Sequence, residues 1–323
     1  MSQNSPVQGG NTGEIRPNVL MLGGFGRSGS TLLERCLAEC VGVTGLGEVL
    51  HLWERGLRDN ELCGCGLAFH DCDFWKTIGQ RAYGGWGTID VAESVADRLG
   101  VVRNRRLAEL LTGLYAPGRR QSARRLAARV TGLYEAAAGH DSQLVVDSSK
   151  HPAYAYFLRR AAVNVKCVLV VRDPRGVAYS WSKVVRRPET GAAEAYMPRY
   201  STVAAVANWS LYSALFHALT LLGVPVKTVH YEDFMSDPRA VVEDILLFAG
   251  YPLQPGDTDF IQPHSVVLAA HHTVAGNPMR MKTGVLEFRL DEAWKVKMPA
   301  KERRIAGALT LPLRLFYGQR SQK

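Results

Sequence analysis

The sequence predicts an α/β fold in which helices cover both faces of a central, parallel sheet. Short valine-rich runs alternate with helix-start signals along the chain, and a glycine-rich turn separates the first run from the first helix. Strands that are apolar at consecutive positions are typical of parallel sheets buried on both faces. Because parallel strands need crossover connections, the alternation indicates three layers, α/β/α, with a ligand site at the carboxyl ends of the strands.

The predicted elements follow one another in a regular order. Residues 19–22 form the first strand candidate, and apolar positions at helical spacing begin at Ser30. Further strand candidates are residues 144–146, 165–171 and 226–231. Pro152 and Pro174 stand where proline opens a helix without losing a hydrogen bond, and Asp237 caps another helix.

An arginine-rich insertion interrupts this order at about residues 90–139, with a turn predicted at Pro117 and Gly118. Eight arginines and one acid, Glu109, lie between Arg103 and Arg129, whereas the whole chain carries a net charge of +9. A solvated helical face is the default interpretation. Among functional roles we favour a mobile lid near an acceptor site, while attraction of an acidic substrate or contact with anionic lipid stays open.

Composition and length set the class of protein. With 46% hydrophobic and 21% charged residues, the 323-residue chain excludes a long disordered protein, a collagen and a coiled coil. We expect a disordered tail at residues 1–17 and a single domain over residues 18–323.

The chain has no long apolar run and no secretory signal pattern, so we expect a cytoplasmic protein without a transmembrane segment. Few aromatic residues interleave with the arginines, which argues against nucleic acid as a partner. The oligomeric state is left open.

The strongest motif is GFGRSGST at residues 24–31, directly between strand and helix. Its glycines let backbone amides converge on an anion at the helix N-terminus, and Ser28, Ser30 and Thr31 add hydroxyl donors. The spacing matches the nucleotide-binding P-loop, except that Ser30 replaces the lysine and Arg27 supplies the positive charge. Without that lysine, and without a clear acidic partner for magnesium, γ-phosphoryl transfer loses two of its usual parts.

A second motif lies at the end of the third long strand candidate. Arg172 follows the strand and Ser180 comes eight residues later, about two helical turns on. Both side chains can reach one anion. The alternative is a structural ion pair of Arg172 with Asp173 or another acid.

Together the two motifs resemble the PAPS-dependent sulfotransferase superfamily, in particular its bacterial and tyrosylprotein-type branches, with their P-loop-like fold. The resemblance implies that Arg27, Ser28, Gly29, Ser30 and Thr31 hold the 5′-phosphosulfate of 3′-phosphoadenosine 5′-phosphosulfate (PAPS). Arg172 and Ser180 would then hold its 3′-phosphate. The segment GNPMR suggests Asn277 and Arg280 as a late clamp on the donor.

Sulfuryl transfer also needs a base for the acceptor hydroxyl and a cation for the developing charge. The resemblance implies that Glu48 is the base, provided that burial raises its pKa, and that Lys150 and Arg27 offset charge on the leaving oxygen. His151 is the rival base. We expect no metal in this reaction.

A cysteine segment, LCGCGLAFHDCDFW, leaves three interpretations open. Cys63, Cys65, Cys72 and His70 supply enough ligands for one tetrahedral zinc, but the spacing is unusual for it. A redox-sensitive pair and a packed structural loop are the alternatives, and the loop is favoured.

The sequence therefore predicts a sulfotransferase that moves a sulfuryl group from PAPS to a hydroxyl of a small molecule or natural product and releases PAP. The alternatives are a P-loop kinase using ATP and a non-catalytic protein that binds PAP or a polyanion. The identity of the acceptor is beyond the reach of the sequence.

Overall fold

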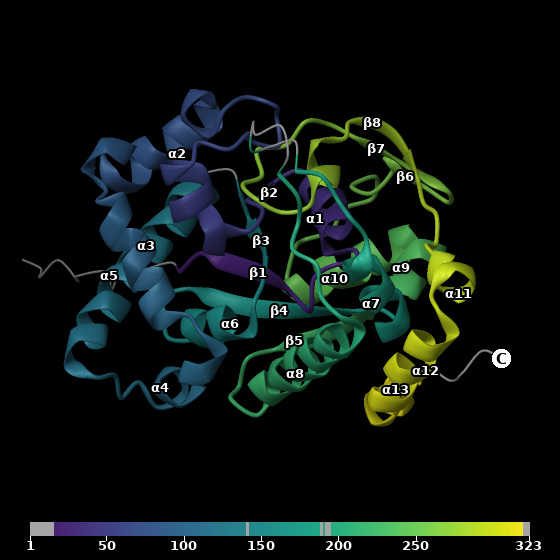
Figure 1. The fold of residues 1–323 in the computed structure, drawn as a ribbon. Helices are drawn as coiled ribbons and strands as arrows, with labels where there is room; N and C mark the ends of the chain where they lie inside the picture. The colour runs from purple at the N-terminus through teal and green to yellow at the C-terminus, as the bar shows by residue number, and fades with distance from the viewer. Residues whose placement is uncertain (1–15, 140–141, 188–189, 191–194, 319–323) are drawn as a thin grey trace, which may run out of the picture.

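The computed structural model describes residues 16–139, 142–187, 190 and 195–318, so the predicted tail lies outside the described residues except for Arg16 and Pro17. Its centre is a five-stranded parallel sheet with the strand order β2-β3-β1-β4-β5 (Figure 1). The strands are β1 (Asn18–Gly23), β2 (Val43–Gly45), β3 (Leu144–Lys150), β4 (Asn164–Val171) and β5 (Val226–His230). The predicted α/β fold with a central parallel sheet is confirmed.

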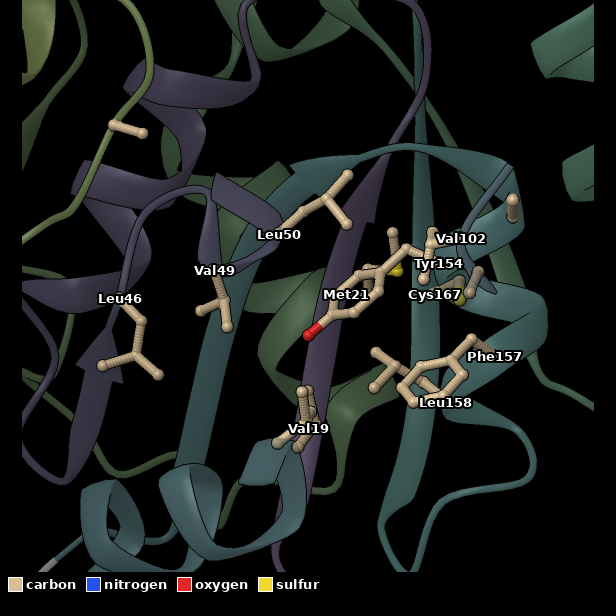
Figure 2. Packing of buried hydrophobic residues seen from close by; sticks show 14 of the residues in the cluster. Val19, Met21, Leu46, Val49, Leu50, Val102, Tyr154, Phe157, Leu158 and Cys167 are labelled. Carbon is tan, nitrogen blue, oxygen red and sulfur yellow. The ribbon is translucent and has the colours of Figure 1, made fainter. Parts of the chain in front are cut away.

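Both faces of the sheet are buried, as the continuous apolar runs predict. Successive side chains of a strand point to opposite faces. Val19 and Met21 of β1 therefore pack into one apolar core, shown in Figure 2, whereas Leu20 and Leu22 pack into the other. The register carries this pattern across the sheet, because Val19 is aligned with Val145 of β3 and Val165 of β4.

Helices cover the two faces. The core that contains Leu20 is closed by α1 and α10, and the core that contains Val19 is closed by α5, α6 and α8. A small antiparallel sheet, β6 (Ile261–Gln262), β7 (Ser265–Leu268) and β8 (Gly284–Glu287), lies near α1 at the far side from the insertion (Figure 1). The α-helices are α1 (Ser30–Ala38), α2 (Asp73–Tyr83), α3 (Val91–Val101), α4 (Leu107–Thr112), α5 (Pro117–Ala138), α6 (Pro152–Leu158), α7 (Pro174–Ser182), α8 (Thr202–Thr220), α9 (Tyr231–Ser236), α10 (Pro238–Ala249), α11 (Ala293–Lys297), α12 (Ala300–Leu309) and α13 (Leu311–Phe316).

The connection between β2 and β3 is helical over a longer stretch than predicted. Helical turns begin at Val49, well before residue 90, and include 3-10 and π turns between Val49 and Arg58. The predicted turn at Pro117 and Gly118 is wrong, because these residues are the first two of α5. Proline has no N–H to lose in a first helical turn, and its fixed φ suits that position.

Acidic residues of α3 offset part of the basic charge of the insertion. Arg125 and Arg129 of α5 both contact Asp97, at 2.7 and 3.1 Å, and Arg129 also pairs with Glu93. The predicted lid role of the insertion stays a prediction. Within the described part of the chain, the helices lack the length and apolar character that crossing a bilayer requires.

Candidate active site

The glycine turn between β1 and α1 is held in a shape that needs its glycines. Gly24 has φ 120°, and a Cβ there would lie 2.6 Å from the carbonyl oxygen of Val170. Gly29 has φ 89°, and its Cβ would meet the Tyr231 ring at 2.6 Å. The turn therefore packs directly onto the neighbouring elements, and the first residues of α1, Ser30 and Thr31, line a cavity at the carboxyl ends of the strands.

The Ser28 hydroxyl does not point into the cavity, although the sequence predicted it as a donor to a bound anion. It donates to the carbonyl oxygen of Phe25 at 2.7 Å, is buried, and braces the turn from inside. Ser28 is not among the residues that line the cavity. Because the hydroxyl is engaged in the turn, only the backbone amide of Ser28 can donate to an anion.

Arg27 presents a partly buried cation to the cavity. Its guanidinium donates to the Met197 sulfur at 3.1 Å and lies over the Trp181 ring, 5.2 Å from the ring centre. Its Nε is buried without a hydrogen-bond partner, and no described carboxylate lies within ion-pair distance of it. Burial lowers the pKa of Arg27, opposed by the charge of Glu48. A cation held by a ring and a thioether is well placed to receive an anionic ligand.

Arg172 and Ser180 reach the same cavity, as the motif predicts. Arg172 follows β4, and its guanidinium lies over the Tyr231 ring at 4.5 Å and donates to the Arg27 carbonyl oxygen at 3.1 Å. It also pairs with the carboxylate of Asp291 at 3.2 Å. The predicted alternative, an ion pair of Arg172 with Asp173 or another acid, is therefore met by Asp291, whereas Asp173 pairs with Arg175 at 2.5 Å.

Glu48 and Lys150 form an ion pair across the cavity. The Lys150 Nζ, at the end of β3, donates to Glu48 Oε1 at 2.6 Å. Burial raises the pKa of Glu48, but the charges of Lys150 and His51 and the hydrogen bond from Lys150 outweigh it and lower the pKa to about 2. The expectation of a raised pKa is therefore wrong for this state, because the buried carboxylate has a cation as its neighbour.

Two histidines flank this pair. His51 Nε2 lies 3.7 Å from Glu48 Oε2, and His151 follows Lys150. Burial is the main cause that lowers the pKa of each to about 4. The Nδ1 of His151 is buried without a hydrogen-bond partner. Both rings are thus neutral near pH 7. His51 was not predicted, since nothing in its spacing marks it apart from its place three residues after Glu48.

Of the two residues predicted as a late clamp on the donor, only Asn277 lines the cavity. Asn277 lines the cavity, and its side-chain oxygen accepts from the Met279 amide at 3.0 Å. Arg280 does not line it. Its guanidinium is buried and donates to the carbonyl oxygens of Thr273 at 2.7 Å and Leu62 at 2.5 Å. The expectation that Arg280 clamps a donor does not fit this placement, because its guanidinium contacts these backbone carbonyls and does not line the cavity.

One cavity of about 700 Å³ joins these groups. Part of its remaining wall is apolar and aromatic, which the sequence could not reveal because the residues come from distant segments, and further charged side chains, among them Arg98 and Arg289, also line it. Phe25 packs against Trp181 and Tyr212 at ring-centre distances of 5.2 and 5.5 Å. The insertion contributes Arg98 and Val102 to the lining.

Comparisons with known proteins bear on this site. A model described as the sulfotransferase family matches residues 18–255. Among solved structures, the sulfotransferase domain from the curacin biosynthetic pathway is 18% identical, with 92% of this chain and 98% of that chain covered and a TM-score of 0.47. The sulfotransferase domain of the Synechococcus PCC 7002 olefin synthase is 16% identical, with 92% and 95% covered and a TM-score of 0.42. Sulfotransferase STF9 from Mycobacterium avium is 13% identical, with 75% and 66% covered and a TM-score of 0.41.

No curated protein sequence matches the chain. The family match covers about three quarters of the chain and includes the glycine turn, Glu48, Lys150, Arg172 and Ser180. The chain therefore belongs to the sulfotransferase family and is an enzyme of that class.

Proposed function

We propose that this enzyme transfers a sulfuryl group from PAPS to a hydroxyl of a small-molecule acceptor. One observation carries the proposal: the glycine turn, the pair Arg172 and Ser180, and the pair Glu48 and Lys150 all line one cavity. Its volume lies within the range of pockets that bind small molecules.

The donor spans the cavity between the two motifs. The amides of the glycine turn, with Ser30 and Thr31, hold the 5′-phosphosulfate at the N-terminus of α1. Arg172 and Ser180 hold the 3′-phosphate, which ATP lacks. For this, Arg172 exchanges the Asp291 carboxylate for the phosphate. The partly buried cation Arg27 faces the phosphosulfate.

The reaction is an in-line displacement at sulfur. The bond from the acceptor oxygen to sulfur forms while the bond from sulfur to the phosphate oxygen breaks, and PAP leaves with that electron pair. The acceptor proton passes to the carboxylate of Glu48, and Lys150 and Arg27 offset charge on the leaving oxygen.

Glu48 needs the donor in order to act as a base. With Lys150 at 2.6 Å its pKa is about 2, too low for efficient proton transfer near neutral pH. The phosphosulfate competes for the Lys150 ammonium, and the pKa of Glu48 rises when that ammonium turns to the donor. His151 is the rival base, since its ring is neutral near pH 7 and its buried Nδ1 has no hydrogen-bond partner; its pKa of about 4 is also below neutral, so it too would need a change in its surroundings to act efficiently.

The apolar wall supports an acceptor with an apolar body. Leu50, Val102, Trp181 and Tyr212 line the cavity together with Glu48. This part of the wall fits the apolar body of a small molecule, while Arg98 and Arg289 on the same lining can face acidic groups of the acceptor.

A thermal-shift comparison tests the donor before any acceptor is known. We expect PAP to raise the melting temperature of the chain more than 5′-AMP or ATP with magnesium does, because only PAP offers a 3′-phosphate to Arg172. The Arg172→Ala variant should lose this preference. Equal shifts from PAP and 5′-AMP in the native chain would contradict the assignment, and a larger shift from ATP with magnesium would favour a kinase.

Turnover of PAPS separates an enzyme from a binding protein. The Glu48→Gln variant should lose about 10²-fold to 10⁴-fold in turnover and still bind PAP. His151→Ala is the matched variant for the rival base. A native-like rate in Glu48→Gln with a large loss in His151→Ala would assign the base to His151.

A further inference from the structure

Four potential metal ligands meet at one point behind the cavity. Cys63, Cys65, Cys72 and His272 each direct one ligand atom to this cluster, and all four atoms lie within 4.8 Å of one another. The sulfurs of Cys65 and Cys72 are 3.8 Å apart, and the sulfur of Cys72 lies 3.2 Å from Nδ1 of His272. Cys63 and Cys72 are buried, and Cys65 and His272 are partly buried.

The separation of the Cys65 and Cys72 sulfurs matches an edge of a zinc tetrahedron, and the separation of the Cys72 sulfur from His272 Nδ1 is about 0.4 Å shorter than the corresponding edge. Bonds of about 2.3 Å to sulfur and about 2.0 Å to nitrogen place two sulfurs about 3.8 Å apart and a sulfur and a nitrogen about 3.6 Å apart. The sulfurs are instead too far apart for a disulfide, whose bond is about 2.05 Å long. We propose that Cys63, Cys65, Cys72 and His272 bind one structural Zn²⁺.

The backbone holds the ligands in place. The Cys63 amide donates to the Leu67 carbonyl oxygen at 2.7 Å, and the Gly66 amide donates to the Cys63 carbonyl oxygen at 2.9 Å, so both ends of a tight turn are fixed. Gly64 lets this turn approach the loop that carries His272, because a Cβ there would lie 2.5 Å from the His271 carbonyl oxygen.

The His272 ring has a fixed orientation as well. It stacks on Phe74, with ring centres 4.8 Å apart and the planes 11° from parallel. Support of this kind orients a metal ligand before the metal binds. Since three thiolates and one imidazole complete a tetrahedron, the zinc has no open position for a substrate and its role is structural.

The cluster differs from the one that the sequence suggested. His70, the histidine inside the cysteine segment, is exposed, and its Nε2 faces the Leu57 carbonyl oxygen at 2.9 Å. His272 takes its place from 200 residues further along the chain than Cys72. The unusual cysteine spacing argued against zinc only as long as all the ligands were sought in one segment.

A zinc ion here fastens the cysteine segment to the backbone that carries Glu48. The Gly64 amide donates to the Thr273 carbonyl oxygen at 3.0 Å, next to His272. The next residue, Val274, exchanges hydrogen bonds with the chain at Leu46 and Glu48, at 2.8 Å each. The buried Arg280 bridges the same two segments through Leu62 and Thr273. The metal thus supports the position of the carboxylate without contacting the reactants.

Metal content tests the proposal independently of enzymatic activity. The full chain, produced with zinc in the medium and purified under reducing conditions, should carry about one zinc per chain by plasma mass spectrometry. His272→Ala should carry less than about a tenth of that amount, whereas the matched control His70→Ala should keep it. Loss of zinc from both variants or from neither would overturn the ligand assignment.

A spectroscopic measurement on the native chain covers the case in which His272→Ala fails to fold. Exchange of the metal for Co²⁺ should give the intense visible bands of a tetrahedral, thiolate-bound ion. A native chain without zinc that gives no such bands would overturn the proposal. The intact mass of the chain purified under reducing conditions gives a second check. A mass lower by two hydrogens would indicate a Cys65–Cys72 disulfide, and it would overturn the proposal by assigning the cluster to redox chemistry.

Discussion

The variants Lys150→Met and Glu48→Gln, made singly and together, measure the interaction free energy of the ion pair that sets the pKa of the proposed base. The two side chains are 2.6 Å apart and only 14% and 15% exposed, so solvent screens them little. Lys150→Met leaves a buried carboxylate without its cation, whereas the double variant leaves a neutral pair. The difference between the single and double variants isolates the interaction between the two charges.

The expected size follows from the carboxylate. Its pKa is about 2 in the folded chain, against an ordinary 4.5. Each pKa unit corresponds to about 1.4 kcal/mol, so the ionised carboxylate contributes roughly 3 kcal/mol to stability at neutral pH, as the net of burial, which opposes ionisation, and of the charges of Lys150, His51 and Arg55. A pKa lowered by folding stabilises above the ordinary value, and this contribution is lost as the pH falls towards the folded value. The net contribution should fall to about 2 kcal/mol at about pH 3.5, and the coupling to Lys150, which we expect to be of the same order, should fall with it.

Urea unfolding of the four proteins at both pH values, followed by tryptophan fluorescence, measures this quantity. Lys227 and Asp244 provide a control, because their atoms are 2.7 Å apart but the carboxylate is 62% exposed. The same cycle at that pair should give less than about 1 kcal/mol. If the Lys150–Glu48 coupling equals that of the control and does not change with pH, the reasoning about the base is wrong.

Two further changes test neighbouring parts of the site. Asp291→Asn should lower the Kd for PAP several-fold and leave the Kd for 5′-AMP unchanged in calorimetry. Asp291 pairs with Arg172, and in the proposed mode of binding the 3′-phosphate has to displace it. An equal gain for both nucleotides would contradict this. Burial raises the pKa of Glu34 to about 7, so ionisation should lower the melting temperature of the native chain as the pH rises from about 4.5 to 7. Glu34→Gln can keep the bonds to the Gly47 amide and the Ser148 hydroxyl and should lack this loss; parallel melting curves for the two proteins would refute it.

The sequence predicts best the residues at the ends of the longer strands. Continuous apolar runs, rich in valine in β3 and β4, reveal β1, β3 and β4, and the carboxyl ends of parallel strands meet at one edge. Arg27, Lys150 and Arg172 follow such runs, so their common cavity could be expected. By contrast β2 spans only three residues and includes the polar Thr44, too short a pattern to separate from a loop.

The rest of the site depends on contacts between distant segments. Asp291 meets Arg172 from 119 residues away, and no spacing in the sequence connects them. The same holds for the pKa of Glu48, because the ammonium that sets it stands 102 residues further along the chain. Burial of Glu48 alone would shift its pKa upwards. A prediction made without Lys150 at 2.6 Å therefore has the wrong sign.

Without a donor, the chain supplies partners of its own for the cations that we assign to PAPS. Lys150 pairs with Glu48 and Arg172 pairs with Asp291, while Arg27 lies over the Trp181 ring. Donor binding then exchanges ion pairs, so the net gain is smaller than the sum of the new contacts. In the proposed mechanism the exchange at Lys150 also has a catalytic effect. If Glu48 becomes basic only when the ammonium turns to the phosphosulfate, the acceptor is deprotonated only when a sulfuryl group is in place to receive its oxygen.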